Sequence, residues 1–279
     1  MSHEDSTTQH RIIGTSKSPL KFFLLVLVPS IPFWLVGFLD LPKILPINLP
    51  ISAMMFVCPM VAALMLVHQD NEPNGMMELL KRTFDFKRIK NKIWYAPILL
   101  LMPVVMLLSY GMMRLLEMPL PEPYIPFYAI PFSFLAFFIG AISEEIGWTG
   151  YITEPLQERW GALVASIILG TVWALWHIIP WFQGYPNPEW VIWQCAATVA
   201  LRILIVWLHN NTGKSVFAAI LFHTTINVSI YMFPNYGSGY DPFITFIILA
   251  IAASIVTFLW DSETLARYRY TSPRSIKEE

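Results

Sequence analysis

Charged residues are scarce in this sequence of 279 residues: they make up 13% of it, against about 25% in an ordinary soluble domain. There are only two cysteines, Cys58 and Cys195, and both lie inside apolar runs, which predicts small buried side chains and no disulfide. The formal net charge of −1 gives no sign of a nucleic-acid partner. No internal repeat, low-complexity segment or cleavable signal peptide is evident.

Hydrophobic residues make up 56% of the chain, and the mean hydropathy of +0.54 predicts a protein embedded in a bilayer. Apolar segments of close to 20 residues, the length that crosses a hydrocarbon core, occur eight times. These segments are Leu20–Leu39, Ile51–His68, Trp94–Leu116, Phe127–Ile152, Ala162–Phe182, Trp190–Leu208, Ser215–Phe233 and Pro242–Trp260. We therefore predict an all-α, multi-pass protein of the cell membrane, with eight transmembrane helices over residues 20–260 and tails at 1–19 and 261–279.

The positions of lysine and arginine predict the orientation of this bundle. With eight spans, one side of the membrane receives Arg11, Lys17, Lys21, Lys81, Arg82, Lys87, Arg88, Lys90, Lys92, Arg159, Lys214, Arg267, Arg269, Arg274 and Lys277. The connections on the opposite side carry Lys43 alone. Since positive charge marks the cytoplasmic side, both termini are expected there, the first as a flexible tail.

The basic stretch 78–92 allows two interpretations. It could form a short amphipathic helix on the inner leaflet, where anionic membrane lipid attracts each basic residue by about 1 kcal/mol. It could also be a simple positively charged loop on the cytoplasmic side. We favour the loop.

Two adjacent carboxylates, Glu144 and Glu145, follow an apolar run and are the main anomaly in the sequence. One ionisable residue in such a setting costs about 2.5–3.5 kcal/mol on insertion scales. The pair could lie in water at a helix end, but apolar residues resume at once with Ile146 and Trp148. Successive helical residues point about 100° apart, so the two side chains should address different partners. We interpret the pair as part of an intramembrane site, in a helix that continues to about Ile152.

Three further polar residues lie within apolar segments. His177 could be a hydrogen-bonded core residue, but in a bilayer polar groups tend to face a bundle interior or cavity. His223 and Asn227 are four residues apart and therefore share a helix face. They could join helices by a hydrogen bond, worth about 0.6 kcal/mol on average, or take part in a site. If Glu144 and His177 share a site, their side chains should lie within about 10 Å of each other.

These residues are compatible with two kinds of water activation. Two imidazoles and a carboxylate, from His177, His223 and Glu144, could bind Zn²⁺ or another divalent metal with one open position, lowering the pKa of bound water to about 7. The same groups could instead act directly as general bases. The His-Glu-x-x-His signature of soluble zinc proteases is missing. The sequence leaves both routes open.

Three motifs in order resemble those of the CAAX protease and bacteriocin-processing family (CPBP, also called Abi), which includes CAAX prenyl endopeptidases. They start at Glu144-Glu145, at Trp173 with His177 four residues on, and at His223 with Asn227 four residues on. The resemblance covers about residues 130–232. It implies that Glu144 and His177 activate the attacking water, that His223 and Asn227 polarise the scissile carbonyl or hold the oxyanion, and that Glu145 supports the site.

The sequence departs from this family at Thr149, where the motif has an arginine one turn after Glu145. Without that cation, a buried Glu145 is expected to favour its neutral form. Arg202, inside the predicted sixth helix, could replace the missing arginine, or its side chain could extend to the cytoplasmic interface. We favour the second interpretation of Arg202.

The sequence therefore predicts a membrane endopeptidase that acts on peptide or protein substrates, either lipidated CAAX-type or bacteriocin and leader-type peptides. A first alternative is an inactive family member that serves as a membrane scaffold or regulator, which Thr149 favours. A second is a transporter whose buried glutamates and histidines relay protons. Transporters often contain internal repeats, and this sequence has none that we can see.

Overall fold

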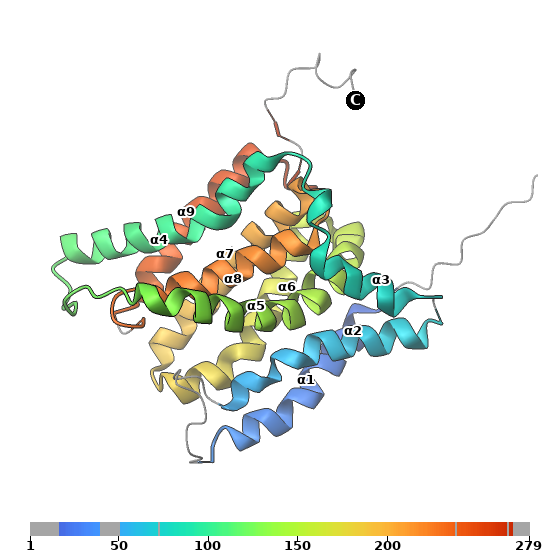
Figure 1. Ribbon diagram of the computed structural model, residues 1–279, viewed down its shortest axis with the longest axis horizontal. Coiled ribbons are helices and arrows are strands. Elements are labelled where there is room, and N and C mark those ends of the chain that lie inside the picture. Colours follow the sequence, from blue (N-terminus) through green and yellow to red (C-terminus); the bar gives the residue numbers. More distant parts are fainter. Residues whose placement is uncertain (1–16, 40–50, 72, 238, 267, 270–279) are drawn as a thin grey trace, which may run out of the picture.

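A computed structural model describes residues 17–39, 51–71, 73–237, 239–266, 268 and 269. The predicted tails lie mostly outside these ranges, as does Lys43. The described part of the chain is built from helices joined by short connections (Figure 1). The α-helices are α1 (Pro19–Val36), α2 (Cys58–Gln69), α3 (Gly75–Lys81), α4 (Tyr95–Leu115), α5 (Ile130–Gly147), α6 (Glu154–Gly184), α7 (Pro188–Asn211), α8 (Val216–Met232) and α9 (Pro242–Leu259).

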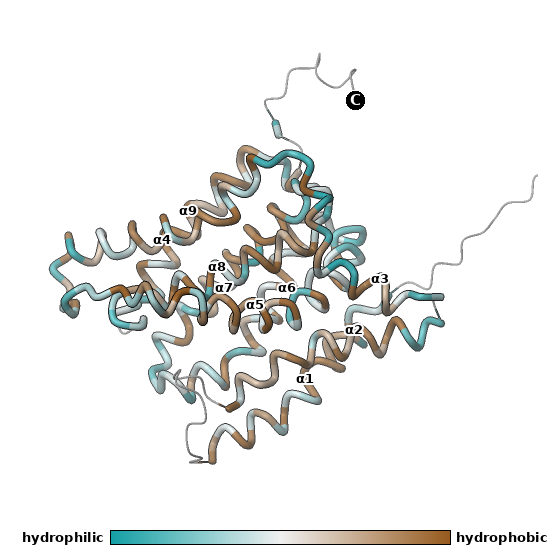
Figure 2. Tube along the Cα trace, in the orientation of Figure 1, coloured by the Kyte–Doolittle hydropathy of each residue, from teal (hydrophilic) through white to brown (hydrophobic). Residues whose placement is uncertain are grey.

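The predicted all-helical architecture is confirmed, whereas the eight membrane crossings stay a prediction. Each of the eight apolar segments overlaps with one of the helices α1, α2 and α4 to α9. Six ranges are long and apolar enough to cross a membrane, and one of these, Phe127–Gly184, contains both α5 and α6. The remaining helix, α8, is apolar but shorter, at 17 residues. Hydrophobic residues dominate the middle of the helices, whereas hydrophilic residues gather in the connections (Figure 2). The orientation of the termini stays a prediction.

The centre of the bundle consists of α5, α6, α7 and α8. In it α6 packs on α7, α5 packs on α8, and α7 also contacts α8. Helices α4 and α9 cover one side of this centre, and α1 and α2 cover the other (Figure 1). The four central helices carry every residue that the sequence singled out as chemically active.

The helix of the glutamate pair continues past them, as the sequence predicted. A π-helix, Trp148–Thr153, follows α5 directly, and the hydroxyl of Thr153 donates a 2.7 Å hydrogen bond to the carbonyl of Trp148. The chain reverses at Gly161, whose φ of 72° is a conformation that side-chain-bearing residues rarely adopt. The part of α6 after Gly161 carries Trp173, whose indole N–H donates a hydrogen bond to Glu144 on α5.

Small residues bring the central helices close together. A Cβ atom added to Gly170 on α6 would lie 3.0 Å from the Cα atom of Val199 and 3.0 Å from the Cβ atom of Arg202, both on α7. A Cβ atom at Gly147 on α5 would collide with the carbonyl of Pro59 on α2. Membrane helices commonly use small residues in this way, because lipid provides no hydrophobic drive for helix association.

The basic stretch between α2 and α4 is helical over most of residues 75–88, so that the loop interpretation of residues 78–92 is wrong for this part. Helix α3 is followed by two short 3₁₀-helices, Arg82–Phe84 and Phe86–Arg88. A local sequence pattern could not show this, because the segment is held by contacts with distant parts of the chain.

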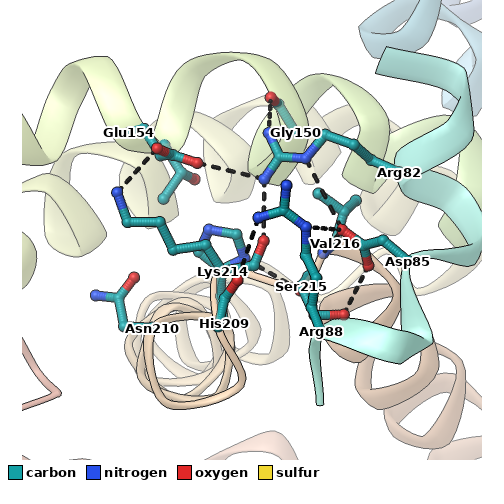
Figure 3. Close-up of polar contacts among 12 residues, drawn as sticks. Arg82, Asp85, Arg88, Gly150, Glu154, His209, Asn210, Lys214, Ser215 and Val216 are labelled. Atoms are coloured by element: carbon teal, nitrogen blue, oxygen red, sulfur yellow. Dashed lines mark hydrogen bonds and ion pairs between the residues drawn. The ribbon is translucent and has the colours of Figure 1, made fainter. Parts of the chain in front are cut away.

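Asp85, in this stretch, caps the N-terminus of α8 (Figure 3). Its carboxylate accepts hydrogen bonds from the Ser215 hydroxyl at 2.7 Å and from the backbone N–H groups of Val216 at 3.2 Å and Phe217 at 3.0 Å. Acidic groups are favourable at a helix N-terminus because the free N–H groups and the helix dipole attract negative charge. The cap fixes the start of the helix that carries His223.

Candidate functional site

Glu145 is completely buried and accepts four hydrogen bonds. Arg202 donates two of them, from Nη1 to Oε2 at 2.9 Å and from Nη2 to Oε1 at 3.2 Å. Nδ1 of His223 lies 2.9 Å from Oε1, and the Thr149 hydroxyl donates to Oε2 at 2.5 Å. These contacts come from α7, α8 and the π-helix, so that one carboxylate joins three segments. With its acceptor positions occupied, Glu145 is suited to positioning its neighbours.

Arg202 is the cationic partner that Glu145 was expected to lack. Its side chain has no solvent exposure, and it lies nine residues before the end of α7 at Asn211, about 13 Å along the helix. Our expectation that it extends to the cytoplasmic interface is therefore wrong. Its guanidinium carbon lies 4.1 Å from the centroid of the Trp173 ring, a cation–π geometry.

Glu144 has different surroundings from Glu145. It is buried, and the indole Nε1 of Trp173 donates a 2.8 Å hydrogen bond to its Oε2. Among the described residues, no side chain or backbone group is hydrogen-bonded to its Oε1. The two adjacent carboxylates thus address different partners, as their angular separation on the helix predicted, and Glu144 keeps free acceptor capacity.

His177 is held by a hydrogen bond and by aromatic rings. Its Nδ1 lies 2.9 Å from the carbonyl oxygen of Trp173, and because a carbonyl can only accept, Nδ1 carries the proton. The neutral ring therefore keeps a lone pair on Nε2. The ring centroids of Trp173, Trp176 and Trp181 lie 5.7, 4.6 and 5.0 Å from that of His177. The side chain is half-buried, which leaves it within reach of a bound molecule.

His223 also packs against Trp173, with ring centroids 5.2 Å apart. Because Glu145 accepts from Nδ1 of His223, the neutral ring has its free lone pair on Nε2. Asn227 lies one turn further along the same face of α8 and is half-buried. In the described part of the chain, the Asn227 amide has no hydrogen-bond partner. The structure thus links Glu144, His177 and His223 through Trp173, and His223 to Glu145 directly, whereas Asn227 forms no hydrogen bond with any of these described residues.

Trp173 contacts four ionisable residues of the candidate site. It donates to Glu144, its ring contacts His177 and His223, and Arg202 lies over its face. The sequence reasoning placed Trp173 in a motif but gave it no role. Its signal was the four-residue spacing from His177, which puts both side chains on one face of α6.

The expected metal ligands do not fit a metal ion as they are arranged. His177, His223 and Glu144 all lie in the described ranges, yet within those ranges no group of three His, Cys, Asp or Glu side chains could hold a metal. Each of the three keeps one possible ligand atom, Nε2 of His177, Nε2 of His223 and Oε1 of Glu144, but in the described ranges these residues do not come together as a metal-binding group.

Comparison with known proteins adds evidence independent of this geometry. Residues 126–229, which include all five candidate residues, match the family described as Type II CAAX prenyl endopeptidase Rce1-like. The chain is also 30% identical, over 190 residues, to CAAX prenyl protease 2 of Methanococcus maripaludis, an alignment that covers 62% of this chain and 68% of that protein.

Proposed function

Because the chain belongs to the Rce1-like type II CAAX prenyl endopeptidase family, we propose that it is a membrane-embedded endopeptidase in which Glu144 and His177 activate the attacking water. The observation that carries this proposal is the convergence of Glu144, His177, His223 and Arg202 on Trp173. Each of these four residues is ionisable, and such groups are rare and usually functional inside a membrane.

In the first step, a carboxylate oxygen of Glu144 takes a proton from the water, whose oxygen attacks the scissile carbonyl carbon. The indole N–H of Trp173 holds Oε2 of Glu144, which leaves Oε1 for the water. The Nε2 lone pair of His177 accepts the second hydrogen bond of the same water. General-base assistance of this kind contributes about 10²–10⁴-fold to a rate.

In the second step, the carbonyl oxygen carries the negative charge of the tetrahedral intermediate. His223 in its doubly protonated form donates from Nε2 to this oxygen, while Glu145 holds its Nδ1–H. The Asn227 amide provides a second donor. The C–N bond then breaks, the proton on Glu144 moves to the departing nitrogen, and a carboxylic acid and an amine are released. We assign no step to a metal ion, because the expected ligands form no metal-binding group in the described ranges.

For the substrate, we propose peptides with a lipidated C-terminal CAAX-type sequence, the class that the name of the Methanococcus relative indicates. Bacteriocin or leader-type peptides are the second class to test. The inactive-scaffold alternative depended on Thr149, but the ion pair between Arg202 and Glu145 supplies the cation that Thr149 cannot. This contact supports an active enzyme.

The test is cleavage by the purified, membrane-reconstituted protein, offered a panel of lipidated CAAX-type and leader-type peptides. We expect at least one peptide to be cleaved, and Glu144→Ala and His223→Ala each to lower the rate by about 100-fold or more. Glu158→Ala, which removes an exposed carboxylate on α6, serves as the control and should leave the rate unchanged. Cleavage that survives both site substitutions would refute the mechanism, and cleavage of no peptide would favour the scaffold.

A further inference from the structure

A second polar site lies away from the glutamates, at the hydrophilic end of the bundle near α3. A cavity of about 420 Å³ opens there between the end of α2, α3, the stretch 82–88 and the π-helix. The charged residues that line it are Lys17, Lys81, Arg82, Arg88, Glu78 and Asp85. We propose that this cavity binds the phosphate of an anionic phospholipid. The proposal does not depend on the proteolytic activity.

The charge of the cavity favours an anion. Four basic residues line it against two acidic ones. Asp85 forms ion pairs with Arg82 at 4.0 Å and with Arg88 at 3.5 Å, so the excess positive charge comes mainly from Lys17 and Lys81. Within the part of the chain that the structure describes, neither Lys17 nor Lys81 forms an ion pair. Basic pockets between membrane helices on the cytoplasmic side are typical sites for lipid head groups.

Arg82 is a fixed part of the cavity wall (Figure 3). Its Nη1 donates to the carbonyl of Gly150 at 2.9 Å, and its Nη2 donates to the carbonyl of Lys214 at 3.0 Å and to Glu154 at 3.3 Å. Its Nε is buried and has no hydrogen-bond partner among the described residues. A guanidinium held from three segments costs little further ordering when an anion binds, which favours a defined site over diffuse attraction.

Exposed apolar side chains beside the cavity favour a lipid over free phosphate. In residues 77–88, the side chains of Met77, Phe84 and Phe86 have exposed fractions of 55%, 59% and 44%. They alternate along the chain with lysines and arginines. This combination is typical of segments that lie in the membrane interface, with apolar side chains among the acyl chains and basic ones at the head groups. A lipid bound there would contact both the cavity and this apolar rim.

The experiment measures binding of dioleoylphosphatidylglycerol and dioleoylphosphatidylcholine to the full-length, detergent-solubilised protein by native mass spectrometry, with inorganic phosphate as a separate titrant. Lys17→Gln/Lys81→Gln removes the two lysines of the cavity, neither of which forms an ion pair with a described residue, although Lys17 lies 4.7 Å from the centroid of the Tyr151 ring. Lys87→Gln/Lys90→Gln removes equal charge from exposed positions on the same stretch that do not line the cavity, and is the matched control. Thermal unfolding establishes that both variants are folded.

We expect phosphatidylglycerol to bind the wild type in preference to phosphatidylcholine. Its affinity should fall about 30-fold in the cavity variant, equivalent to about 1 kcal/mol per lysine, and stay within threefold of the wild type in the control. Equal losses in the two variants would identify diffuse surface attraction and overturn the proposal, as would no loss in the cavity variant. Inorganic phosphate binding as tightly as the lipid would overturn the assignment to a phospholipid.

Discussion

The guanidinium of Arg202 on α7 and the carboxylate of Glu145 on α5 form an ion pair in which neither side chain has any solvent exposure. Removing one partner of such a pair leaves an uncompensated buried charge, which typically costs about 3–5 kcal/mol. We therefore predict that Arg202→Gln lowers the free energy of unfolding by about that amount and reduces cleavage. Arg202→Lys keeps the charge but loses the paired donors, so that its effect should be smaller. Denaturant unfolding of both variants checks this, and an unchanged stability for Arg202→Gln would contradict it.

The arginine that pairs with Glu145 can be moved from position 202 to position 149 by mutation. Thr149 lies four residues after Glu145, and its hydroxyl already donates to that carboxylate. An arginine at position 149 is therefore on the correct helix face to pair with Glu145. We predict that Thr149→Arg restores a substantial part of the stability and cleavage that Arg202→Thr removes. A double variant no more stable or active than Arg202→Thr alone would show that Arg202 does more than supply charge to Glu145.

Trp173→Phe separates the hydrogen bond of this residue from its ring contacts. The substitution keeps an aromatic ring against Arg202 and both histidines but removes the N–H that Glu144 accepts. A hydrogen bond to a charged group contributes about 1.5–3 kcal/mol, so kcat should fall about tenfold or more with little change in KM. The control is Trp34→Phe, which removes an indole N–H that is donated to Sδ of Met55 and not to a candidate residue. Equal kcat values for the two variants would contradict the role of Trp173.

Two helix caps test whether the position of α8 matters to the chemistry. Asp85→Ala removes three hydrogen bonds to the start of α8, which carries His223, and the ion pairs of Asp85 with Arg82 and Arg88, while the Ser215 cap of α8 remains. Asp241→Ala removes the Asp241 hydrogen bond that caps α9, a helix with no candidate residue. Each should destabilise the protein by about 0.5–2 kcal/mol. Only Asp85→Ala should also lower kcat, because it frees the start of the helix that aligns His223. A comparable fall in kcat in Asp241→Ala would mean that general destabilisation accounts for both.

Much of the fold was readable from the sequence because a bilayer imposes length and apolarity on every crossing. That constraint located the helices α4 and α9 to within a residue or two. It also predicted that the helix continues past Glu145, since the apolar residues resume there. The length and apolarity required of a membrane crossing do not predict the structure of residues 75–88. There, α3 and two short 3₁₀-helices depend on contacts such as those of Arg82 with Gly150 and Lys214.

The sequence singles out residues that the structure brings into contact, but it does not predict how they are connected. Glu144, Glu145, His177 and His223 stand out because ionisable groups are costly in a membrane. Arg202 did not stand out as the partner of Glu145, because the two residues are 57 positions apart on different helices. No sequence periodicity relates residues of two different helices. The signal in the sequence is the position of Arg202, nine residues before the end of α7, which favours a buried side chain.

The central claim is that Glu144 is the base that activates water, and Glu144→Gln tests it most directly. Glutamine keeps the size of the side chain and an oxygen that the Trp173 indole can donate to, but it cannot take a proton from water. We predict that kcat for peptide cleavage falls by about 10²–10⁴-fold while the unfolding temperature of the reconstituted protein stays at the wild-type value. A folded Glu144→Gln protein that cleaves within threefold of the wild-type rate would contradict the mechanism.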